Sequence, residues 1–97
     1  MSGKTLYYVE KLEGFDDRKI QESVENDLAY YKNQFYFAEP PTKQHCLWLY
    51  FIRNDGYDAD ILWRSPASIV EIIEIDKNTM RIRTRQGIFT ICKIKQK

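Results

Sequence analysis

Apolar residues recur at helical spacing in the first third of the chain. They are Ile20, Val24, Leu28, Tyr31 and Phe35. Intervals of three and four residues place these side chains on one face of an α-helix. Asp16 precedes the stretch and is a suitable N-cap, because its carboxylate can accept from free backbone N–H groups. The pattern predicts a helix from about residue 17 to residue 33, packed with its apolar face against a sheet because an isolated helix of this length is marginal.

The remaining sequence has strand patterns separated by turn residues. Strands are expected over residues 5–9, 46–53, 58–64, 69–75, 79–85 and 88–94. Residues 46–52 are apolar on both faces, which is typical of a central strand covered on both sides. Turns are expected at residues 54–56, 77–78 and 86–87, and Ser65-Pro66 is expected to interrupt the chain.

These elements predict one small α+β domain. The chain has 97 residues, 43% of them hydrophobic and 30% charged, which is the profile of a single globular unit. Pro40-Pro41 separates a strand and helix (residues 1–38) from a run of antiparallel strands (residues 44–95). Two arrangements fit: an N-terminal helix on an antiparallel sheet, or a helix attached to a small SH3-like or Sm-like barrel of five to six short strands.

Charge is distributed unevenly along the chain. Residues 77–97 contain seven basic and no acidic residues, whereas residues 1–76 contain eight basic and fourteen acidic residues. The two segments therefore carry +7 and −6, although the net charge is only +1. Such asymmetry indicates either a surface for a charged partner or pairing between neighbouring strands.

The compartment follows from what the sequence contains. No apolar run approaches the roughly 18–20 residues that span a membrane, and residues 1–5 carry no apolar segment of a signal peptide. We therefore expect a cytoplasmic protein. Cys46 and Cys92 are expected to be reduced thiols that pack as half-buried apolar residues.

A set of basic residues on the last two strands is the main candidate binding site. The set consists of Arg81, Arg83 and Arg85 on one strand, with Lys93 and Lys95 on the next. Alternate strand residues lie about 7 Å apart on one face, and guanidinium groups bind phosphate or carboxylate in a bidentate manner. The alternative is a solvated face paired with Glu71 and Glu74 on the preceding strand.

Aromatic residues cluster where the helix ends. Of Tyr30, Tyr31, Phe35, Tyr36 and Phe37, we expect Tyr31 and Phe35 to lie in the core because they continue the apolar stripe. Tyr30 and Tyr36 lie off the stripe. They are therefore predicted binding residues, as interface anchors or as rings that stack on bases.

No pattern in the sequence predicts catalysis, a metal or a cofactor. Asp55, Asp58 and Asp60 do not follow the order of a calcium-binding loop. His45 and Cys46 are adjacent on a predicted strand, so their side chains are expected on opposite faces, where they cannot chelate one metal. Nucleotide-binding and hydrolase motifs are absent from the sequence.

The C-terminal third resembles a group of small proteins. The segments SIVEIIEI (68–75) and RTRQGIFTI (83–91) are similar to the ends of uncharacterised proteins carried by phages and mobile elements of low-GC bacteria. The resemblance implies a genomic setting in which small proteins often inhibit host enzymes or defence complexes, in the manner of anti-CRISPR proteins.

Together these observations predict a non-enzymatic binding protein that occludes or modulates a host protein or a protein–nucleic-acid complex. The alternative is a nucleic-acid-binding or nucleotide-binding protein that uses Arg81, Arg83 and Arg85. A pI of 7.7 is low for that alternative, because dedicated nucleic-acid domains commonly exceed about 9. An exposed final strand would also permit a homodimer.

Overall fold

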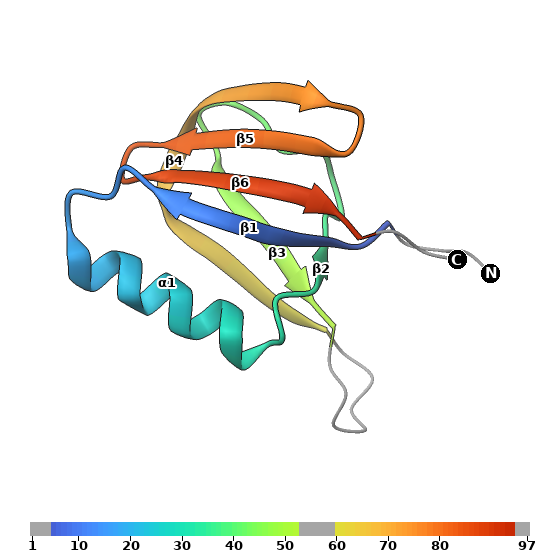
Figure 1. Ribbon diagram of the computed structural model, residues 1–97, viewed down its shortest axis with the longest axis horizontal. Helices are drawn as coiled ribbons and strands as arrows, with labels where there is room; N and C mark the ends of the chain where they lie inside the picture. Colours follow the sequence, from blue (N-terminus) through green and yellow to red (C-terminus); the bar gives the residue numbers. More distant parts are fainter. Residues whose placement is uncertain (1–4, 53–59, 95–97) are drawn as a thin grey trace.

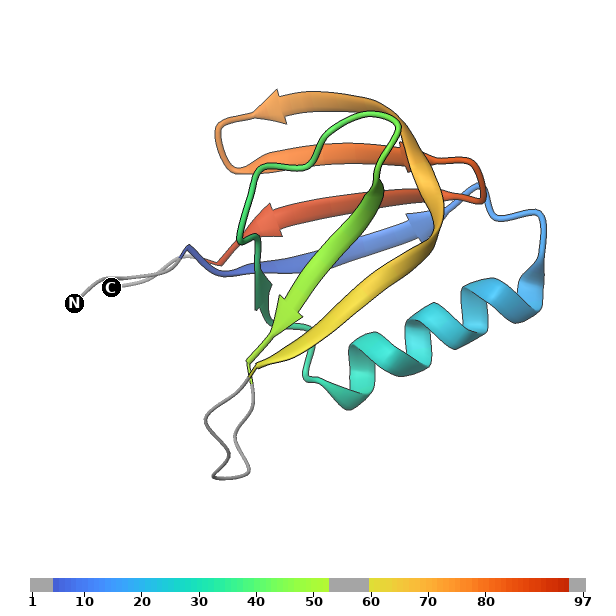
Figure 2. The ribbon, with the colours of Figure 1, turned by 180° about the vertical axis from the view of Figure 1, so that it is seen from behind.

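The computed structural model describes residues 5–52 and 60–94. Within these residues six strands form a closed antiparallel barrel, and one helix packs against it (Figures 1 and 2). In chain order the elements are β1 (Tyr7–Glu13), α1 (Arg18–Tyr30), β2 (Phe35–Tyr36), β3 (Cys46–Phe51), β4 (Ile61–Asp76), β5 (Thr79–Thr84) and β6 (Ile88–Lys93). Each strand pairs with the next, and β6 returns to β1. The α+β class is confirmed, and of the two arrangements that fitted the sequence the barrel is present.

The helix is shorter than its apolar stripe predicted. It begins after Asp17, not Asp16, because the Asp17 carboxylate accepts from the backbone N–H groups of Lys19 (2.9 Å) and Ile20 (3.4 Å). It ends at Tyr30, because Lys32 and Asn33 adopt left-handed conformations (φ 61° and 52°) that turn the chain out of the helix. The predicted end at residue 33 was therefore wrong. Phe35, for which the sequence permitted either a helix end or a brief extended segment, belongs to β2.

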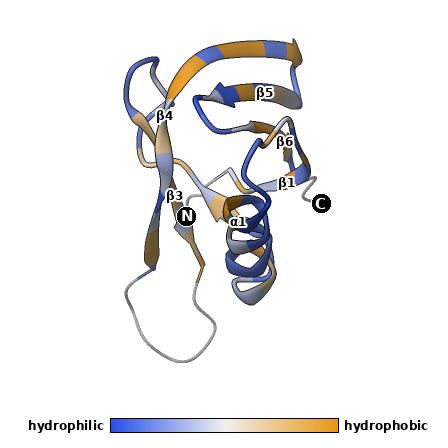
Figure 3. Cartoon of the chain, turned by 90° about the vertical axis from the view of Figure 1, so that its left-hand side faces the viewer, coloured by the Kyte–Doolittle hydropathy of each residue, from blue (hydrophilic) through white to orange (hydrophobic). Residues whose placement is uncertain are grey.

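The helix lies where β1 and β2 diverge. These strands share one residue pair, Tyr7 with Phe35, and beyond it the Asn33 side chain takes the place of a strand neighbour. Its Nδ2 donates to the Val9 carbonyl (2.8 Å), and its Oδ1 accepts from the Val9 N–H (2.9 Å). Figure 3, which looks along α1, places the helix between β1 and the β3–β4 pair.

Side chains of α1 complete the core at this position. Val24 and Leu28 are buried against the barrel, as the apolar stripe predicted. The Trp63 indole N–H of β4 donates to the Asp27 carboxylate over 2.9 Å. Tyr31, just after the helix, stacks on Phe51 with ring centres 4.8 Å apart. Within the described residues, the helix is therefore fixed by packing together with the bond from Trp63 to Asp27.

Strand β4 is continuous, so the interruption predicted at Ser65-Pro66 was wrong. Its first half pairs with β3 and its second half with β5, so it carries the chain around a corner of the barrel (Figure 2). The pairing register with β3 shifts in this region, where Pro66 can be accommodated without a ladder hydrogen bond. The buried Ser65 hydroxyl accepts from the Leu47 N–H (2.9 Å) and donates to the Ala67 carbonyl (2.7 Å).

Strand β3 is covered on one face only, which corrects the prediction of a doubly covered strand. Leu47, Leu49 and Phe51 point into the barrel and are 0% exposed, whereas Trp48 on the outer face is 44% exposed. The misleading feature was the apolar character of the outer residues. The barrel has a single interior, so a large ring on the outside of β3 must remain partly in solvent.

The tight turns predicted at residues 77–78 and 86–87 are present, while the turn predicted at residues 54–56 lies outside the described residues. In the turn after β5, the buried Thr84 hydroxyl donates to the Gly87 carbonyl (2.9 Å) and accepts from the Gly87 N–H (3.1 Å). Both cysteines are free, with Cys46 half-buried as expected and Cys92 buried, more than expected. No helix within residues 5–52 and 60–94 is long and apolar enough to cross a membrane.

Candidate functional site

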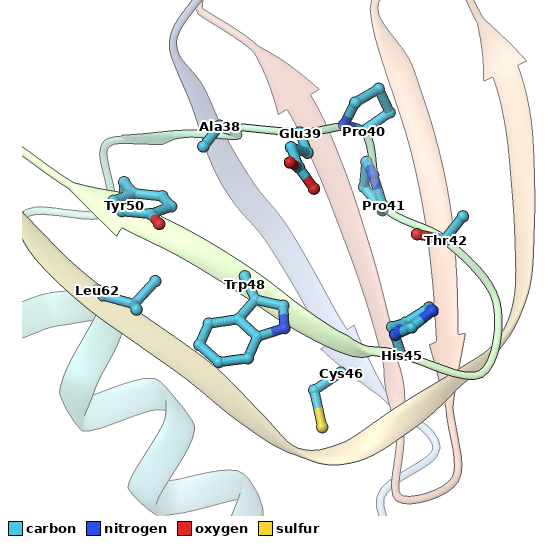
Figure 4. Close-up of a pocket in the computed structure, with 10 residues that line it drawn as sticks. All are labelled: Ala38, Glu39, Pro40, Pro41, Thr42, His45, Cys46, Trp48, Tyr50 and Leu62. Atoms are coloured by element: carbon cyan, nitrogen blue, oxygen red, sulfur yellow. The ribbon is translucent and has the colours of Figure 1, made fainter.

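The most distinctive surface feature is a cavity of about 420 Å³ beside β3. We call it the β3 cavity. One wall is the outer face of the β3–β4 pair, with Trp48, Tyr50 and Leu62. The other wall is the loop between β2 and β3, including Glu39, Pro40 and Pro41, which runs alongside the strand in Figure 4. Ala38, Thr42, His45 and Cys46 complete the lining.

The aromatic side chains around this cavity are held in place by neighbours. Tyr36 and Tyr50 stack nearly parallel, with ring centres 5.4 Å apart and an interplanar angle of 19°. The Tyr36 hydroxyl donates to an Asp60 carboxylate oxygen over 2.6 Å. The Arg64 guanidinium lies 5.6 Å from the centre of the Trp48 ring, within cation–π distance. A ligand would therefore meet rings that lose little freedom on binding.

The cavity also borders an unpaired edge of β3. The N–H of Ile52 donates to the Gln34 carbonyl (3.4 Å), so residues 50 and 52 direct their backbone groups toward β2. By the same alternation, the N–H and C=O of Trp48 point to this edge. However, β2 ends at Tyr36, opposite Tyr50. Within the described residues the structure records no hydrogen bond to either Trp48 group on this side.

A second cavity, of about 460 Å³, lies at the end of the barrel where β1 and β5 begin. Its lining is more apolar and includes Tyr7, Ile72 and Met80. Partial burial raises the pKa of the Tyr7 hydroxyl above its usual range. Pro40 and Pro41 line both cavities, so the loop between β2 and β3 separates them.

The predicted arginine row lies outside both cavities. Arg81 and Arg83 are exposed on the outer face of β5. Nε and Nη2 of Arg83 each lie 3.2 Å from one carboxylate oxygen of Glu71, the cross-strand neighbour on β4. Glu74 does not pair with this row, because it stands opposite Met80. One arginine of the row thus already has a carboxylate partner.

Arg81 also lies among mixed charges. Lys11 Nζ is 2.9 Å from a Glu13 carboxylate oxygen on β1. This hydrogen bond and the Lys11 charge, with a smaller contribution from Arg81, hold the pKa of Glu13 below its usual range. The acidic strands β1 and β4 therefore flank β5 and β6, and the charge separation along the chain is not reproduced in space.

The other predicted basic residues do not extend the row. Arg85 lies beyond the end of β5 and lines a third cavity, of about 370 Å³, with Lys43 and Ser68. Lys93 follows the buried Phe89 and Ile91 on alternate positions of β6, so it is not on the outer face with Arg81. Lys95 lies outside the described residues.

The two tyrosines predicted as binding residues, Tyr30 and Tyr36, lie in different surroundings. Tyr30, at the end of α1, is 79% exposed, as expected, and its edge meets the ring of Tyr31. Tyr36 is half-buried and belongs to the aromatic wall described above. Tyr36 itself lines the second cavity, and it reaches the β3 cavity only through its stacking on Tyr50.

The histidine and the cysteines do not form a recognisable reactive centre. His45 and Cys46 line the same cavity, contrary to the expectation of opposite faces, because His45 lies in the turn before β3 where strand alternation does not apply. Over the part of the chain that the structure describes, no three histidine, cysteine or acidic side chains are close enough to hold a metal.

Cys92 is surrounded by polar groups on the outer side of β6. Its sulfur lies 3.6 Å from a Glu10 carboxylate oxygen and 3.7 Å from the Thr79 hydroxyl. The neighbouring Cys92 raises the pKa of Tyr8, through charge and then through a hydrogen bond. The recorded neighbours of the sulfur are a carboxylate and a hydroxyl, and neither supplies the positive charge that activates a cysteine nucleophile.

Sequence reasoning missed most of the β3 cavity. Trp48 and Tyr50 were hidden in an uninterrupted apolar run, and Leu62 and Arg64 were assigned only to a hairpin partner. The sequence pattern that could have revealed this cavity is the alternation of Trp48 and Tyr50 with Leu47 and Leu49. This alternation places the aromatic rings on one face of the strand and the leucines on the other.

No protein-family model, curated protein or solved structure matches the chain.

Proposed function

We propose that the chain is a non-enzymatic binding protein that occupies a surface of a protein partner, as an inhibitor or modulator of the phage or mobile-element type would. The contact surface in this proposal is the β3 cavity with its aromatic wall. The observation that carries it is the exposure of Trp48 and Leu62, 44% and 47%, beside a preformed hollow.

Two properties of this surface support a protein partner. Aromatic side chains such as tryptophan and tyrosine supply much of the binding energy at protein interfaces, especially in preformed pockets. Among the described residues, those that line the β3 cavity include one carboxylate, Glu39, and no lysine or arginine, and the Arg64 guanidinium lies beside them over the Trp48 ring. A phosphate-rich ligand would therefore meet one neighbouring cation and no basic lining, whereas an apolar protein segment fits the exposed rings.

The test compares two exposed apolar residues of similar accessibility. Trp48 in the β3 cavity is 44% exposed, and Ile73, on the half of β4 that pairs with β5, is 43% exposed. Tagged wild-type protein, Trp48→Ala and Ile73→Ala are used for affinity capture from a lysate of the native host. Each capture is repeated with nuclease and at two salt concentrations.

The proposal expects one stoichiometric protein that survives nuclease, binds the wild type and Ile73→Ala, and is lost with Trp48→Ala. Circular dichroism of each variant confirms that the fold is retained. A partner that binds Trp48→Ala as well as it binds the wild type would contradict the proposed surface.

A nucleic-acid ligand is the second candidate, and the exposure of Arg81 and Arg83 on one face of β5 favours it. Binding of this kind falls with salt, with a logarithmic slope of about −0.7 to −0.9 per phosphate contacted. The Glu71 carboxylate on Arg83 reduces the positive potential of that face. Recovery of nuclease-sensitive, salt-sensitive material that is lost with Arg81→Ala would establish this reading in place of the first.

A further inference from the structure

We infer that the β3 cavity binds an extended peptide segment of its partner as an added β-strand, paired with the free edge of β3 at Trp48. This inference rests on the proposed function, because it specifies how the same surface would hold a protein. It adds a distinct physical element, backbone hydrogen bonding, which side-chain docking alone does not require.

The geometry begins with the early end of β2. This strand has two residues, and its pairing with β3 covers only Tyr50 and Phe51. The next position on the same edge is Trp48, whose N–H and C=O have no recorded partner among the described residues. The other edge of β3 faces β4, where Leu49 and Phe51 are paired with Trp63 and Ile61. This short piece of β3 thus retains an open edge.

An open edge of this kind is a template for strand addition. An extended chain laid beside it satisfies the exposed N–H and C=O groups and so gains main-chain hydrogen bonds. The β3 cavity supplies the space for such a chain, since it lies between this strand and the loop that carries Pro40 and Pro41 (Figure 4). Prolines on the opposite wall have no N–H with which to compete for the Trp48 carbonyl.

The lining specifies the chemistry of the peptide. An added strand would direct alternate side chains to the outer face, where Trp48 and Tyr50 lie, so an apolar or aromatic side chain is favoured there. Among the described lining residues Glu39 is the one carboxylate and is exposed, so a lysine or arginine next to that position would be stabilised. The expected ligand is therefore an extended, apolar segment with a basic residue near Glu39.

The experiment uses heptapeptides from a random display library, selected on the folded wild-type protein and counter-selected on Trp48→Ala. The best peptide is then synthesised in two forms that carry N-methyl groups on alternate residues, in one frame or in the other. N-methylation removes backbone donors without changing side chains. In an added strand, one frame faces β3 and the other faces away.

Strand addition predicts that one frame loses about tenfold in affinity, since it removes the donor to the Trp48 carbonyl and places a methyl group against the edge, while the other frame binds within about threefold of the unmodified peptide. The amide of Trp48 should also become protected from hydrogen exchange when the unmodified peptide binds. Because the changes are made in the peptide, a failure of the protein to fold cannot imitate this result.

Three other outcomes would overturn the inference in distinguishable ways. Equal effects of the two frames, with binding still lost in Trp48→Ala, would refute strand pairing but leave the proposed binding surface intact. Failure to select any peptide that depends on Trp48 would count against both. Concentration-dependent dimerisation that protects the Trp48 amide without peptide would show that the edge is occupied by a second copy of the chain.

Discussion

Asn33 is predicted to be a principal determinant of stability, because its side chain replaces a missing strand partner where β1 and β2 separate. Replacement by alanine removes the bonds from Nδ2 to the Val9 carbonyl and from the Val9 N–H to Oδ1. Val9 itself is 7% exposed, so water cannot readily replace the lost partner. The perturbation therefore leaves both a donor and an acceptor of one buried residue unsatisfied.

The expected magnitude follows from two contributions. Each buried polar group left without a partner costs about 1–3 kcal/mol, which gives about 2–4 kcal/mol for the pair when both lie near the lower half of that range. Asn33 also has a φ of 52°, a left-handed conformation that asparagine tolerates better than alanine, and this adds about 1 kcal/mol. We expect Asn33→Ala to lower the free energy of unfolding by about 3–5 kcal/mol.

The assay is urea unfolding followed by tryptophan fluorescence and circular dichroism, with thermal melts in parallel. A loss of this size corresponds to a fall in Tm of at least about 12 °C for a domain of this length. Asn33→Gly should be about 1 kcal/mol less harmful than Asn33→Ala, because glycine adopts positive φ without strain. Gln34→Ala is the control, since the exposed Gln34 contributes only its backbone carbonyl to the recorded bonds.

If Asn33→Ala were within 1 kcal/mol of the wild type, or no worse than Gln34→Ala, the amide would not hold the barrel closed. The substitution should also affect the candidate site, because β2 and the loop that lines the β3 cavity follow Asn33 directly in the chain. If Asn33→Ala is destabilising, it should therefore also weaken the binding of any ligand in the β3 cavity, although Asn33 does not line it.

Two further predictions concern a buried hydroxyl and a surface ion pair. Thr84→Val should lower the free energy of unfolding by about 1–3 kcal/mol, because the buried Gly87 N–H loses its acceptor. Thr90→Val is the control and should change the free energy of unfolding by less than about 0.5 kcal/mol, since no hydrogen bond of the Thr90 hydroxyl is recorded among the described residues. Equal losses in urea unfolding would refute the role given to the turn hydroxyl. Lys11→Ala should raise the pKa of Glu13 toward its ordinary value near 4.5 in an NMR titration. Because the Glu13 pKa is depressed in the folded protein, the Lys11–Glu13 pair stabilises the fold above the ordinary pKa of Glu13, and this stabilisation is lost as the pH falls through the folded pKa. An unchanged Glu13 titration in Lys11→Ala would refute the assignment.

Local patterns in the sequence identified the elements whose residues interact with near neighbours. The apolar stripe of Ile20, Val24 and Leu28 was sufficient for the helix, and the turns at residues 77–78 and 86–87 followed from their residue types. Alternation on β5 correctly placed Arg81 and Arg83 on one face. These features depend on the 3.6-residue and 2-residue periods of the backbone, which any single sequence displays.

The helix boundary and the path of β4 depended on contacts with distant residues. Asn33 adopts a left-handed conformation in the structure that bonds its side chain to Val9, 24 residues away, and this ends the helical region before the stripe ends. Pro66 appeared to be a break, but the adjacent Ser65 hydroxyl joins β4 to Leu47 and the strand continues. The conformational preferences of the residues near Asn33 or Ser65 give no information about these distant partners, Val9 and Leu47.

The sequence by itself determined the class of the domain, its helix, most of its strands and the uneven charge along the chain. Only the tertiary structure decided that the sheet closes, which face of β3 remains outside, and which acids lie beside the basic strands. The physical reason is that closure depends on pairing between β1 and β6, at opposite ends of the chain. In the closed barrel Leu47 and Leu49 face the interior, so Trp48 between them lies on the outside, and the short β2 leaves its backbone edge open.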